Sequence, residues 1–243
     1  MKSFYIEEDL KVGKLFNLIG SEHNHLSKVL RSKVGEVVLV YNNTNFLFTC
    51  EIKDIKKEFT TLCVISREEA KTNPKSNLTL FVALLKGEKF EFLITKLTEL
   101  GVSCIVPFES EFCTSKNVRD KETRQKQIAI DAIKQCKRTK LIEISKPLKF
   151  NEMLSSLNAF DKVLFAYEKD ENHSLKDVLK EIKSNEKVAV IVGSEGGFSE
   201  KEAEEIVKSG AIQISLGNRI LRAETACVAL STIVLNHLGE YEV

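Results

Sequence analysis

Two glycine-bearing segments decide the fold: VAVIVGSEGG (residues 188–197) and AIQISLGNRILRAETA (residues 211–226). Each begins with an apolar run typical of a buried strand, reaches a turn that contains glycine, and continues into a helical pattern. Glycine at a strand end lets main-chain N–H and C=O groups approach a ligand that a Cβ would block, and it permits backbone angles closed to other residues. The two turns therefore predict a ligand pocket formed largely by main-chain atoms.

The same alternation of strand and helix extends back to residue 78. Gly101 closes a helix predicted over 90–100, Ser199 and Glu202 form a capping box, and Gly210 ends the helix that they start. Strands are predicted over residues 78–85, 102–107, 162–167, 188–192 and 211–216. This order predicts an α/β fold with a mainly parallel sheet, in which ligands bind at the carboxyl ends of the strands. Both glycine turns lie at such ends.

The first part of the chain has a different pattern. Short β-rich runs at 36–41, 46–52 and 59–65 are separated by turn residues, which predicts a small β-barrel. A short helix over 21–31 precedes them, with Leu26, Val29 and Leu30 expected on its buried side and His25, Lys28 and Arg31 at the surface. Such a barrel is either an RNA-binding module or a structural domain without a ligand.

A polar segment over 67–77 that includes Pro74 reads as a linker. We therefore predict a barrel domain over residues 1–70 and an α/β domain over residues 75–243.

Composition excludes several classes of site. Six cysteines are scattered without a C-x-x-C pair, which argues against zinc and disulfides, and four histidines without acidic or cysteine clusters predict no metal site. The acidic first residues and the lack of a long apolar run predict a soluble, cytoplasmic protein that does not enter a membrane. Glycine spacing fits neither G-x-G-x-x-G nor a P-loop, and Ser194 is not in a G-x-S-x-G elbow.

Charge is unevenly distributed along the chain. The formal net charge is +1, yet residues 114–140 carry nine basic residues against three acids. The basic residues are Lys116, Arg119, Lys121, Arg124, Lys126, Lys134, Lys137, Arg138 and Lys140. This segment is either a footprint for phosphate groups or a solvated helix face.

Together these residues resemble the RsmE family of small-subunit ribosomal RNA methyltransferases, within the SPOUT (trefoil-knot) superfamily. The resemblance runs nearly end to end. It rests on both glycine turns and on Asn24-His25, Val29-Leu30-Arg31 with Gly35, Lys86-Gly87-Glu88-Lys89, Lys96 with Glu99-Leu100-Gly101-Val102, and Gln135-Cys136-Lys137-Arg138. Ser194 departs from the proline usual in the family, from which we expect a slightly looser loop and the same ligand.

The resemblance implies a knotted C-terminal domain, a PUA-like first domain, S-adenosylmethionine as cofactor, and a homodimer whose paired subunits complete each active site. It implies methylation of a uridine at N3 in 16S rRNA of the small ribosomal subunit. The residues expected to bind the cofactor are Phe165, Ala166, Gly193, Glu195, Gly196, Gly197, Leu216, Gly217, Ile220, Leu221, Thr225 and Ala226. Glu195 has the alternative role of holding its loop through hydrogen bonds.

Uracil N3 carries a proton that must leave before its lone pair can attack a methyl group. A cation beside the carbonyl oxygens favours the anion, and a carboxylate can accept the proton. Arg222 or Arg138 is therefore expected to polarise the base, and Glu224 to orient or deprotonate it. The alternative for Glu224 is stabilisation of the last helix at its N-terminus. Cys136 and Cys227 lie in apolar helical stripes and are expected in the core, since this chemistry needs no covalent adduct.

The residues expected to contact RNA are His25, Arg31, Lys89, Arg124 and Arg138, with the target base flipped out of its helix. The sequence is also compatible with two other functions. One is a SPOUT methyltransferase that acts on tRNA or on a ribose 2'-hydroxyl. The other is a ribosome-assembly factor that binds RNA without catalysis, which Arg222 and Glu224 argue against.

Overall fold

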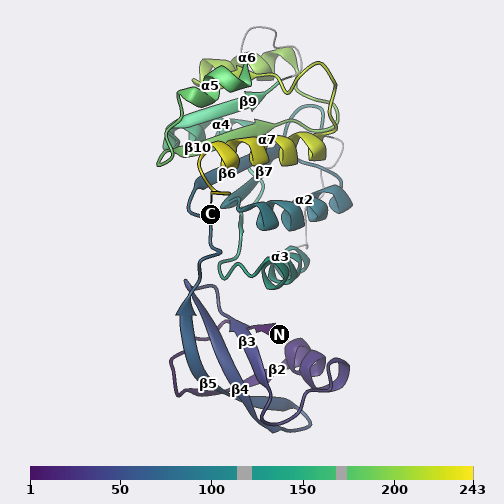
Figure 1. Cartoon of the computed structure of the whole chain (residues 1–243). Coiled ribbons are helices and arrows are strands. Elements are labelled where there is room, and N and C mark those ends of the chain that lie inside the picture. Colours follow the sequence, from purple (N-terminus) through teal and green to yellow (C-terminus); the bar gives the residue numbers. More distant parts are fainter. Residues whose placement is uncertain (114–121, 168–173, 243) are drawn as a thin grey trace. The chain divides into compact units, whose positions relative to one another are not determined.

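The structure is a computed structural model that describes residues 1–113, 122–167 and 174–242 (Figure 1). These residues form two compact units: unit 1 comprises Met1–Asn73 and Ile130–Leu141, and unit 2 comprises Pro74–Ala129 and Ile142–Val243. Helix α3 (Glu122–Cys136) contributes its first half to unit 2 and its second half to unit 1. The predicted domains, 1–70 and 75–243, remain a prediction; unit 1 includes a segment that this division assigns to the second domain.

Unit 1 contains a five-stranded sheet that curls into a half-barrel, in the order β1-β3-β4-β5-β2. Its strands are β1 (Ser3–Tyr5), β2 (Leu15–Ile19), β3 (Val37–Tyr41), β4 (Phe46–Ile55) and β5 (Phe59–Glu69). All neighbouring pairs are antiparallel except β1 with β3. Alternate side chains such as Leu18, Val40 and Ile52 point inward and form one buried cluster. The barrel-like first part predicted from the sequence is confirmed, whereas β1 and β2 were not predicted.

The helix predicted over residues 21–31 begins as α1 (Gly20–Asn24) and continues as the π-helix η1 (His25–Val29). The N–H of Leu30 bonds to the carbonyl of His25, five residues back, at 2.9 Å. This wider turn rotates the later side chains away from the α-helical period. The prediction that Val29 is buried is therefore wrong: 71% of its surface is exposed, while Leu26 is fully buried.

Unit 2 contains a wholly parallel six-stranded sheet in the order β11-β9-β10-β6-β7-β8. Its strands are β6 (Asn77–Ala83), β7 (Cys104–Phe108), β8 (Glu143–Ile144), β9 (Lys162–Ala166), β10 (Lys187–Val192) and β11 (Ile212–Ile214). The predicted α/β fold with a mainly parallel sheet is confirmed. The two glycine turns follow the carboxyl ends of β10 and β11. Because β9 lies between these two strands and all three are parallel, both turns lie on the same side of the sheet, close to each other.

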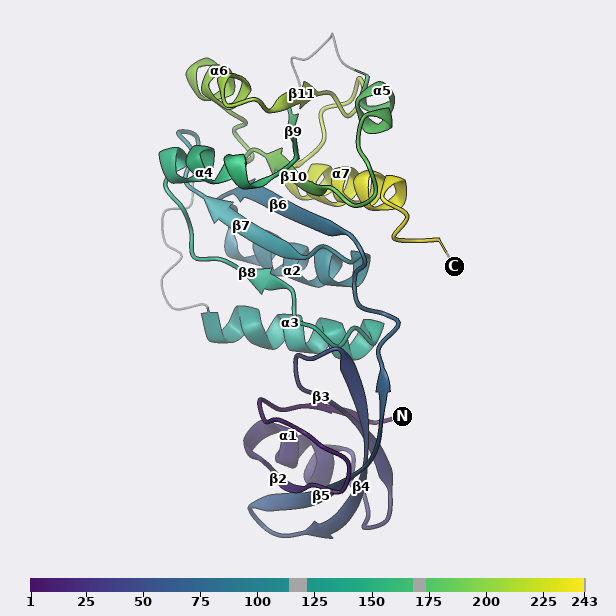
Figure 2. The ribbon, with the colours of Figure 1, turned by 90° about the vertical axis from the view of Figure 1, so that its left-hand side faces the viewer.

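Helices cover both faces of this sheet, and Figure 2 shows α2 and α4 on opposite sides of β6 and β7. Helix α2 (Gly87–Leu100) packs against α7 (Ala223–His237), which also contacts β6 and β10. On the other face, α4 (Phe150–Ser156), η2 (Leu157–Ala159) and α6 (Glu200–Lys208) join a buried cluster with alternate strand residues such as Phe81, Phe108 and Phe165. Helix α5 (Leu175–Lys180) completes the unit.

Two expected local features are present. Gly101 ends α2 in the left-handed conformation at a φ of 101°, and Ser199 and Glu202 form the capping box of α6.

Within the described ranges, no helix is long and apolar enough to cross a lipid bilayer. The same residues contain no group of three or more His, Cys, Asp or Glu side chains placed to hold a metal ion.

Candidate functional site

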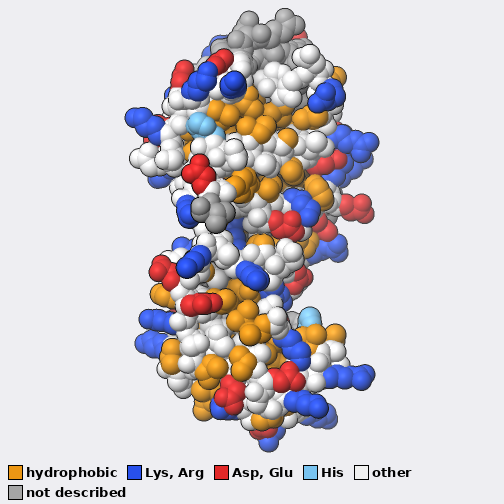
Figure 3. Space-filling model, viewed as in Figure 1, with side chains coloured by type: hydrophobic (Ala, Val, Ile, Leu, Met, Phe, Trp, Pro, Cys, Tyr) orange, Lys and Arg blue, Asp and Glu red, His pale blue; other side chains and the backbone are white. Residues whose placement is uncertain are grey.

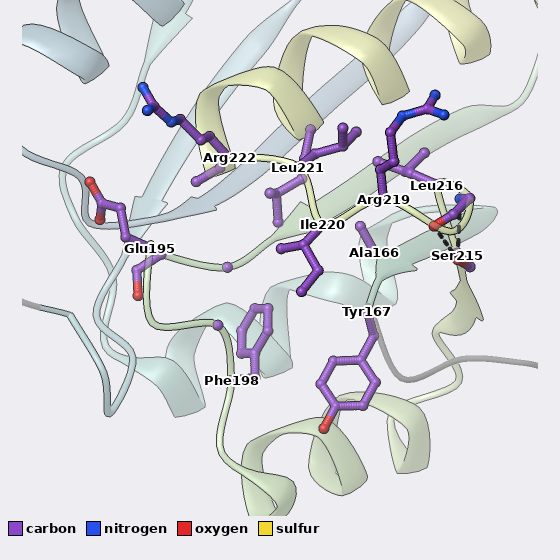
Figure 4. A pocket seen from close by; sticks show the side chains of 17 residues that line it. Ala166, Tyr167, Glu195, Phe198, Ser215, Leu216, Arg219, Ile220, Leu221 and Arg222 are labelled. Carbon is purple, nitrogen blue, oxygen red and sulfur yellow. Dashed lines mark hydrogen bonds between the residues drawn. The ribbon is translucent and has the colours of Figure 1, made fainter.

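A pocket of about 270 Å³ lies where β9, β10 and β11 end and α7 begins (Figure 4). Both glycine turns form its walls, as the sequence predicted. The lining residues are Ala166, Tyr167, Val192, Gly193, Ser194, Glu195, Gly197, Phe198, Ser215, Leu216, Gly217, Arg219, Ile220, Leu221, Arg222, Ala223 and Ala226.

The first turn holds its shape through internal hydrogen bonds. The N–H of Gly197 donates to the carbonyl of Ser194 at 3.0 Å, and Gly197 has a φ of 70°, a conformation that favours glycine. The Ser194 hydroxyl donates to the carbonyl of Phe112 and accepts from the N–H of Gly196, each at 3.3 Å. Serine therefore ties this turn to residue 112 through its side chain.

Two glycines of the first turn lie against aromatic side chains of the protein. A Cβ on Gly193 would lie 2.8 Å from Cε2 of Phe198, and a Cβ on Gly196 would lie 2.8 Å from Cβ of Phe112. These separations are shorter than van der Waals contact, so neither position can accept a larger residue without movement. Glycine at these two positions therefore permits the loop to pack closely against Phe198 and Phe112.

The second turn is open and exposed. Gly217 has a φ of 97°, with nothing within 4 Å of where its Cβ would be, and its N–H donates to the Ser215 hydroxyl at 3.2 Å. Ile220 is 88% exposed although it is apolar, and Figure 4 shows its side chain directed into the pocket above Phe198 and Tyr167. An exposed apolar side chain at the mouth of a pocket is suited to cover an apolar ligand.

The structure brings most of the expected cofactor-binding residues to this pocket. Ala166, Gly193, Glu195, Gly197, Leu216, Gly217, Ile220, Leu221 and Ala226 line it, whereas Phe165, Gly196 and Thr225 are absent from the lining. Phe165 is fully buried and supports the wall, with its ring centroid 5.4 Å from that of Tyr167 and 5.0 Å from that of Phe198.

The sequence analysis missed Tyr167, Val192, Ser194, Phe198, Ser215, Arg219 and Ala223 as lining residues. Tyr167 and Ser215 each follow a strand directly, so the rule that ligands bind at carboxyl ends of parallel strands would have found them.

Three charged side chains meet beside the pocket. Nζ of Lys89 lies 2.8 Å from Oε1 of Glu195 and 3.4 Å from Oε2 of Glu224. The pKa of Lys89 is raised, chiefly by its hydrogen bond to Glu195, against partial desolvation. Partial burial acts to raise the pKa of Glu195, but the hydrogen bond and charge of Lys89 outweigh it, so this pKa is lowered. Lys89 and Glu195 are therefore both charged at neutral pH.

Arg222 and Glu224 lie at the start of α7, where Arg222 is the N-cap and Glu224 is in the first turn. Arg222 lines the pocket and is exposed, and Figure 4 shows Arg219 and Arg222 directed outward on opposite sides. Oε2 of Glu224 is buried and forms the ion pair with Lys89 at 3.4 Å, but it accepts no hydrogen bond of good geometry from the described residues. Glu224 thus has the expected placement at a helix N-terminus, where a carboxylate is favoured.

The residues expected to contact RNA have varied environments. Arg124 forms an ion pair with Glu91 at 2.6 Å, while His25 is exposed with its ring edge-on to Phe4. Arg31 is exposed at a φ of 45°, and Arg138, in unit 1, is 4% exposed with Nη2 at 3.5 Å from the carbonyl of Leu141. Lys116, Arg119 and Lys121 lie outside the described residues. RNA contact by these side chains stays a prediction.

Two family models match the chain: an RNA methyltransferase domain over residues 71–235 and an RNA methyltransferase PUA domain over residues 18–62. The ribosomal RNA small subunit methyltransferase E of Buchnera aphidicola subsp. Acyrthosiphon pisum is 31% identical over 242 residues, covering 98% of this chain and 94% of that protein.

Two solved structures extend the similarity to the fold. A methyltransferase from Legionella pneumophila, in complex with SAM, is 28% identical with a TM-score of 0.87 and 96% of each chain covered. The ribosomal RNA small subunit methyltransferase E from Neisseria gonorrhoeae, bound to S-adenosyl methionine, is 25% identical with a TM-score of 0.86 and 97% of each chain covered.

Proposed function

Because this chain belongs to the ribosomal RNA small subunit methyltransferase E family, we propose that it transfers a methyl group from S-adenosylmethionine to N3 of a uridine in 16S rRNA. One observation carries the proposal: two glycine turns at the carboxyl ends of β10 and β11 enclose a pocket beside Arg222 and Glu224. The family resemblance and the SPOUT fold class inferred from the sequence are confirmed.

The pocket has the chemical character that S-adenosylmethionine requires. Ile220, Leu221 and Phe198 offer apolar walls to an adenine ring, and the two turns present main-chain N–H and C=O groups to its polar edge. Bound there, S-adenosylmethionine would supply an electrophilic methyl carbon on a sulfonium. The protein's task is to exclude water around that carbon and to present the nucleophile in line with it.

Arg222 and Glu224 are suited to prepare the uracil. The exposed guanidinium of Arg222 has no ion pair or hydrogen bond with the described residues, so it is available to a uracil carbonyl oxygen, where it would favour the anion left by loss of the N3 proton. The carboxylate of Glu224, a partly buried residue in the first turn of α7, is suited to accept a hydrogen bond from that N3–H group. The sequence also offers Arg138 for this role, but its side chain is buried in unit 1, so we assign the role to Arg222.

The outer face of α7 supports the proposal that the protein is a homodimer. Figure 3 shows hydrophobic side chains gathered over the part of unit 2 that α7 occupies. Its partly or fully exposed residues include Val228, Ala229 and Ile233, although the opposite face is already buried. Apolar residues on the outer face of a helix whose inner face is already buried are typical of a helix covered on both sides, which a second copy would achieve.

The proposal is tested by methylation of 16S rRNA taken from a strain that lacks the enzyme. The purified protein and S-adenosylmethionine are added to naked rRNA, to small subunits and to tRNA, and nucleosides are identified by mass spectrometry. We expect 3-methyluridine in rRNA or small subunits alone. A methylated ribose, or modification of tRNA, would contradict the proposed substrate, and no methylation despite bound cofactor would indicate an assembly factor.

A further inference from the structure

We propose that Lys89 is a positioning residue that joins the first glycine turn to the start of α7 and so fixes the two sides of the cofactor pocket. The inference rests on the proposed function, because the pocket that Lys89 fixes is the one assigned to S-adenosylmethionine. It is an alternative to the expectation that Lys89 contacts RNA, and the experiment below distinguishes the two.

Lys89 lies at a position on α2 that is unfavourable for a cation, which indicates that its ammonium group has acidic partners. Lys86 is the N-cap of α2, so Lys89 lies in the first turn, where the helix dipole disfavours a cation. Two carboxylates compensate for this placement: Glu195 at 2.8 Å and Glu224 at 3.4 Å. The ion pairs with Glu195 and Glu224 thus explain why a lysine is found in the first turn of α2.

The three side chains come from three separate segments of unit 2. Lys89 extends from α2, Glu195 from the first glycine turn, and Glu224 from α7 directly after the second turn. Glu195 lines the pocket itself, and Glu224 follows the lining residues Arg222 and Ala223. One ammonium group therefore links both turns through their own residues or immediate neighbours.

Removal of this ammonium would leave two carboxylates facing the same space, with Lys86 as a further cation that acts on Glu195. Like charges that share a site repel, and one of them then takes up a proton more readily. The first turn and the start of α7 would move apart, which enlarges the pocket and weakens its grip on the cofactor. Lower pH would relieve the repulsion by protonating one carboxylate.

The ion pairs leave Lys89 poorly placed to bind phosphate as well. Its side chain is 30% exposed, and those of Glu195 and Glu224 are 29% and 17% exposed, so two acidic side chains lie beside one partly exposed ammonium group. A phosphate at Nζ would have to displace at least one carboxylate. Lys89 differs in this respect from Arg222, whose exposed guanidinium has no ion pair with the described residues.

The test compares Lys89→Met, Lys89→Arg and the matched control Lys96→Met. Lys96 lies on the same helix and forms its own ion pair with Glu99 at 2.9 Å, away from the pocket. Calorimetry gives the Kd for S-adenosylmethionine at pH 7.5 and pH 5.5, and filter binding of a 16S rRNA fragment gives the salt dependence of RNA affinity.

We expect Lys89→Met to raise the Kd for S-adenosylmethionine about tenfold at pH 7.5, with partial recovery at pH 5.5. Lys89→Arg should restore most of the affinity, and Lys96→Met should match wild type. Wild type should show little change in Kd over the same interval, because the lowered pKa of Glu195 keeps its carboxylate charged there. The salt slope for RNA should be unchanged.

Two results would overturn the inference. An unchanged cofactor Kd in Lys89→Met, with a salt slope for RNA reduced by about one, would make Lys89 a phosphate contact. A Kd raised equally at both pH values and not restored by arginine would indicate general damage to the fold. Should Lys89→Met fail to fold, Glu195→Gln breaks the 2.8 Å ion pair from its other side and should raise the Kd at pH 7.5; an unchanged Kd in a folded Glu195→Gln protein would contradict the link. Failure of wild type to bind S-adenosylmethionine is a separate result that overturns the proposed function.

Discussion

Phe112 lies directly against Gly196, so that a Cβ on the glycine would be 2.8 Å from Cβ of Phe112 and 3.2 Å from its carbonyl oxygen. The obstruction includes the main chain, which cannot rotate away as the end of a flexible side chain can. The segment that contains Phe112 therefore packs against the first glycine turn. We expect the conformation of the pocket to depend on this contact.

Gly196→Ala is expected to lower the free energy of unfolding by about 2 kcal/mol, since overpacking forces the loop or Phe112 to shift. S-adenosylmethionine binding should weaken with it. Gly217→Ala is the matched control in the second turn: nothing lies within 4 Å of its Cβ position, so only the positive φ opposes the change, at about 1 kcal/mol. Urea unfolding and calorimetry measure both. Equal losses in the two variants would contradict the packing argument.

Ser194→Ala should lower stability by about 1 kcal/mol, because it removes a hydroxyl that bonds to the Phe112 carbonyl and the Gly196 N–H. Ser215→Ala is the control, since that hydroxyl bonds within an exposed turn where water can replace it. Thermal unfolding of the two variants gives the comparison. A Ser194→Ala protein as stable as wild type would show that the side chain does not hold the loop.

Arg222→Ala and Glu224→Gln should each slow single-turnover methylation about a hundredfold, since each removes a group that favours loss of the uracil N3 proton. The Kd for S-adenosylmethionine should change by no more than about threefold. Rapid quench with labelled cofactor, alongside calorimetry, separates the two effects. Normal single-turnover rates in both variants would contradict the assignment.

Cys227→Ala should retain methyl transfer and lose about 1 kcal/mol of stability, because its side chain fills a site in the core. Cys227 is fully buried on α7, and burial raises the pKa of its thiol well above the ordinary range. Mass spectrometry of quenched reactions should find no protein–RNA adduct. Loss of activity in a folded Cys227→Ala protein would require a nucleophilic role after all.

The strands, the capping box and the pocket were predictable because each depends on local pattern. Periodic apolar residues located β6, β9 and β10, and glycine after a strand located both turns. Short elements such as β1 and β8 carry too few residues to show a period. The burial of Val29 was mispredicted because a π-turn changes the helical period without any marker in the sequence.

The partners of charged residues were not predictable. The sequence shows no acidic partner for Lys89 or Arg124. In the fold, Lys89 pairs with Glu195 and Glu224, and Arg124 pairs with Glu91. The support that Phe112 gives to Gly196 likewise joins residues 84 positions apart in the sequence, and no spacing rule connects them.

The central claim is that main-chain atoms of the two turns hold the methyl donor. Amide NMR spectra of the labelled protein, recorded as S-adenosylmethionine is added, test it most directly. The account predicts large shifts for the amides of Gly193, Gly197, Gly217 and Leu221, with those of Val40 and its neighbours in unit 1 unchanged. Unshifted amides in both turns at saturating S-adenosylmethionine would contradict it.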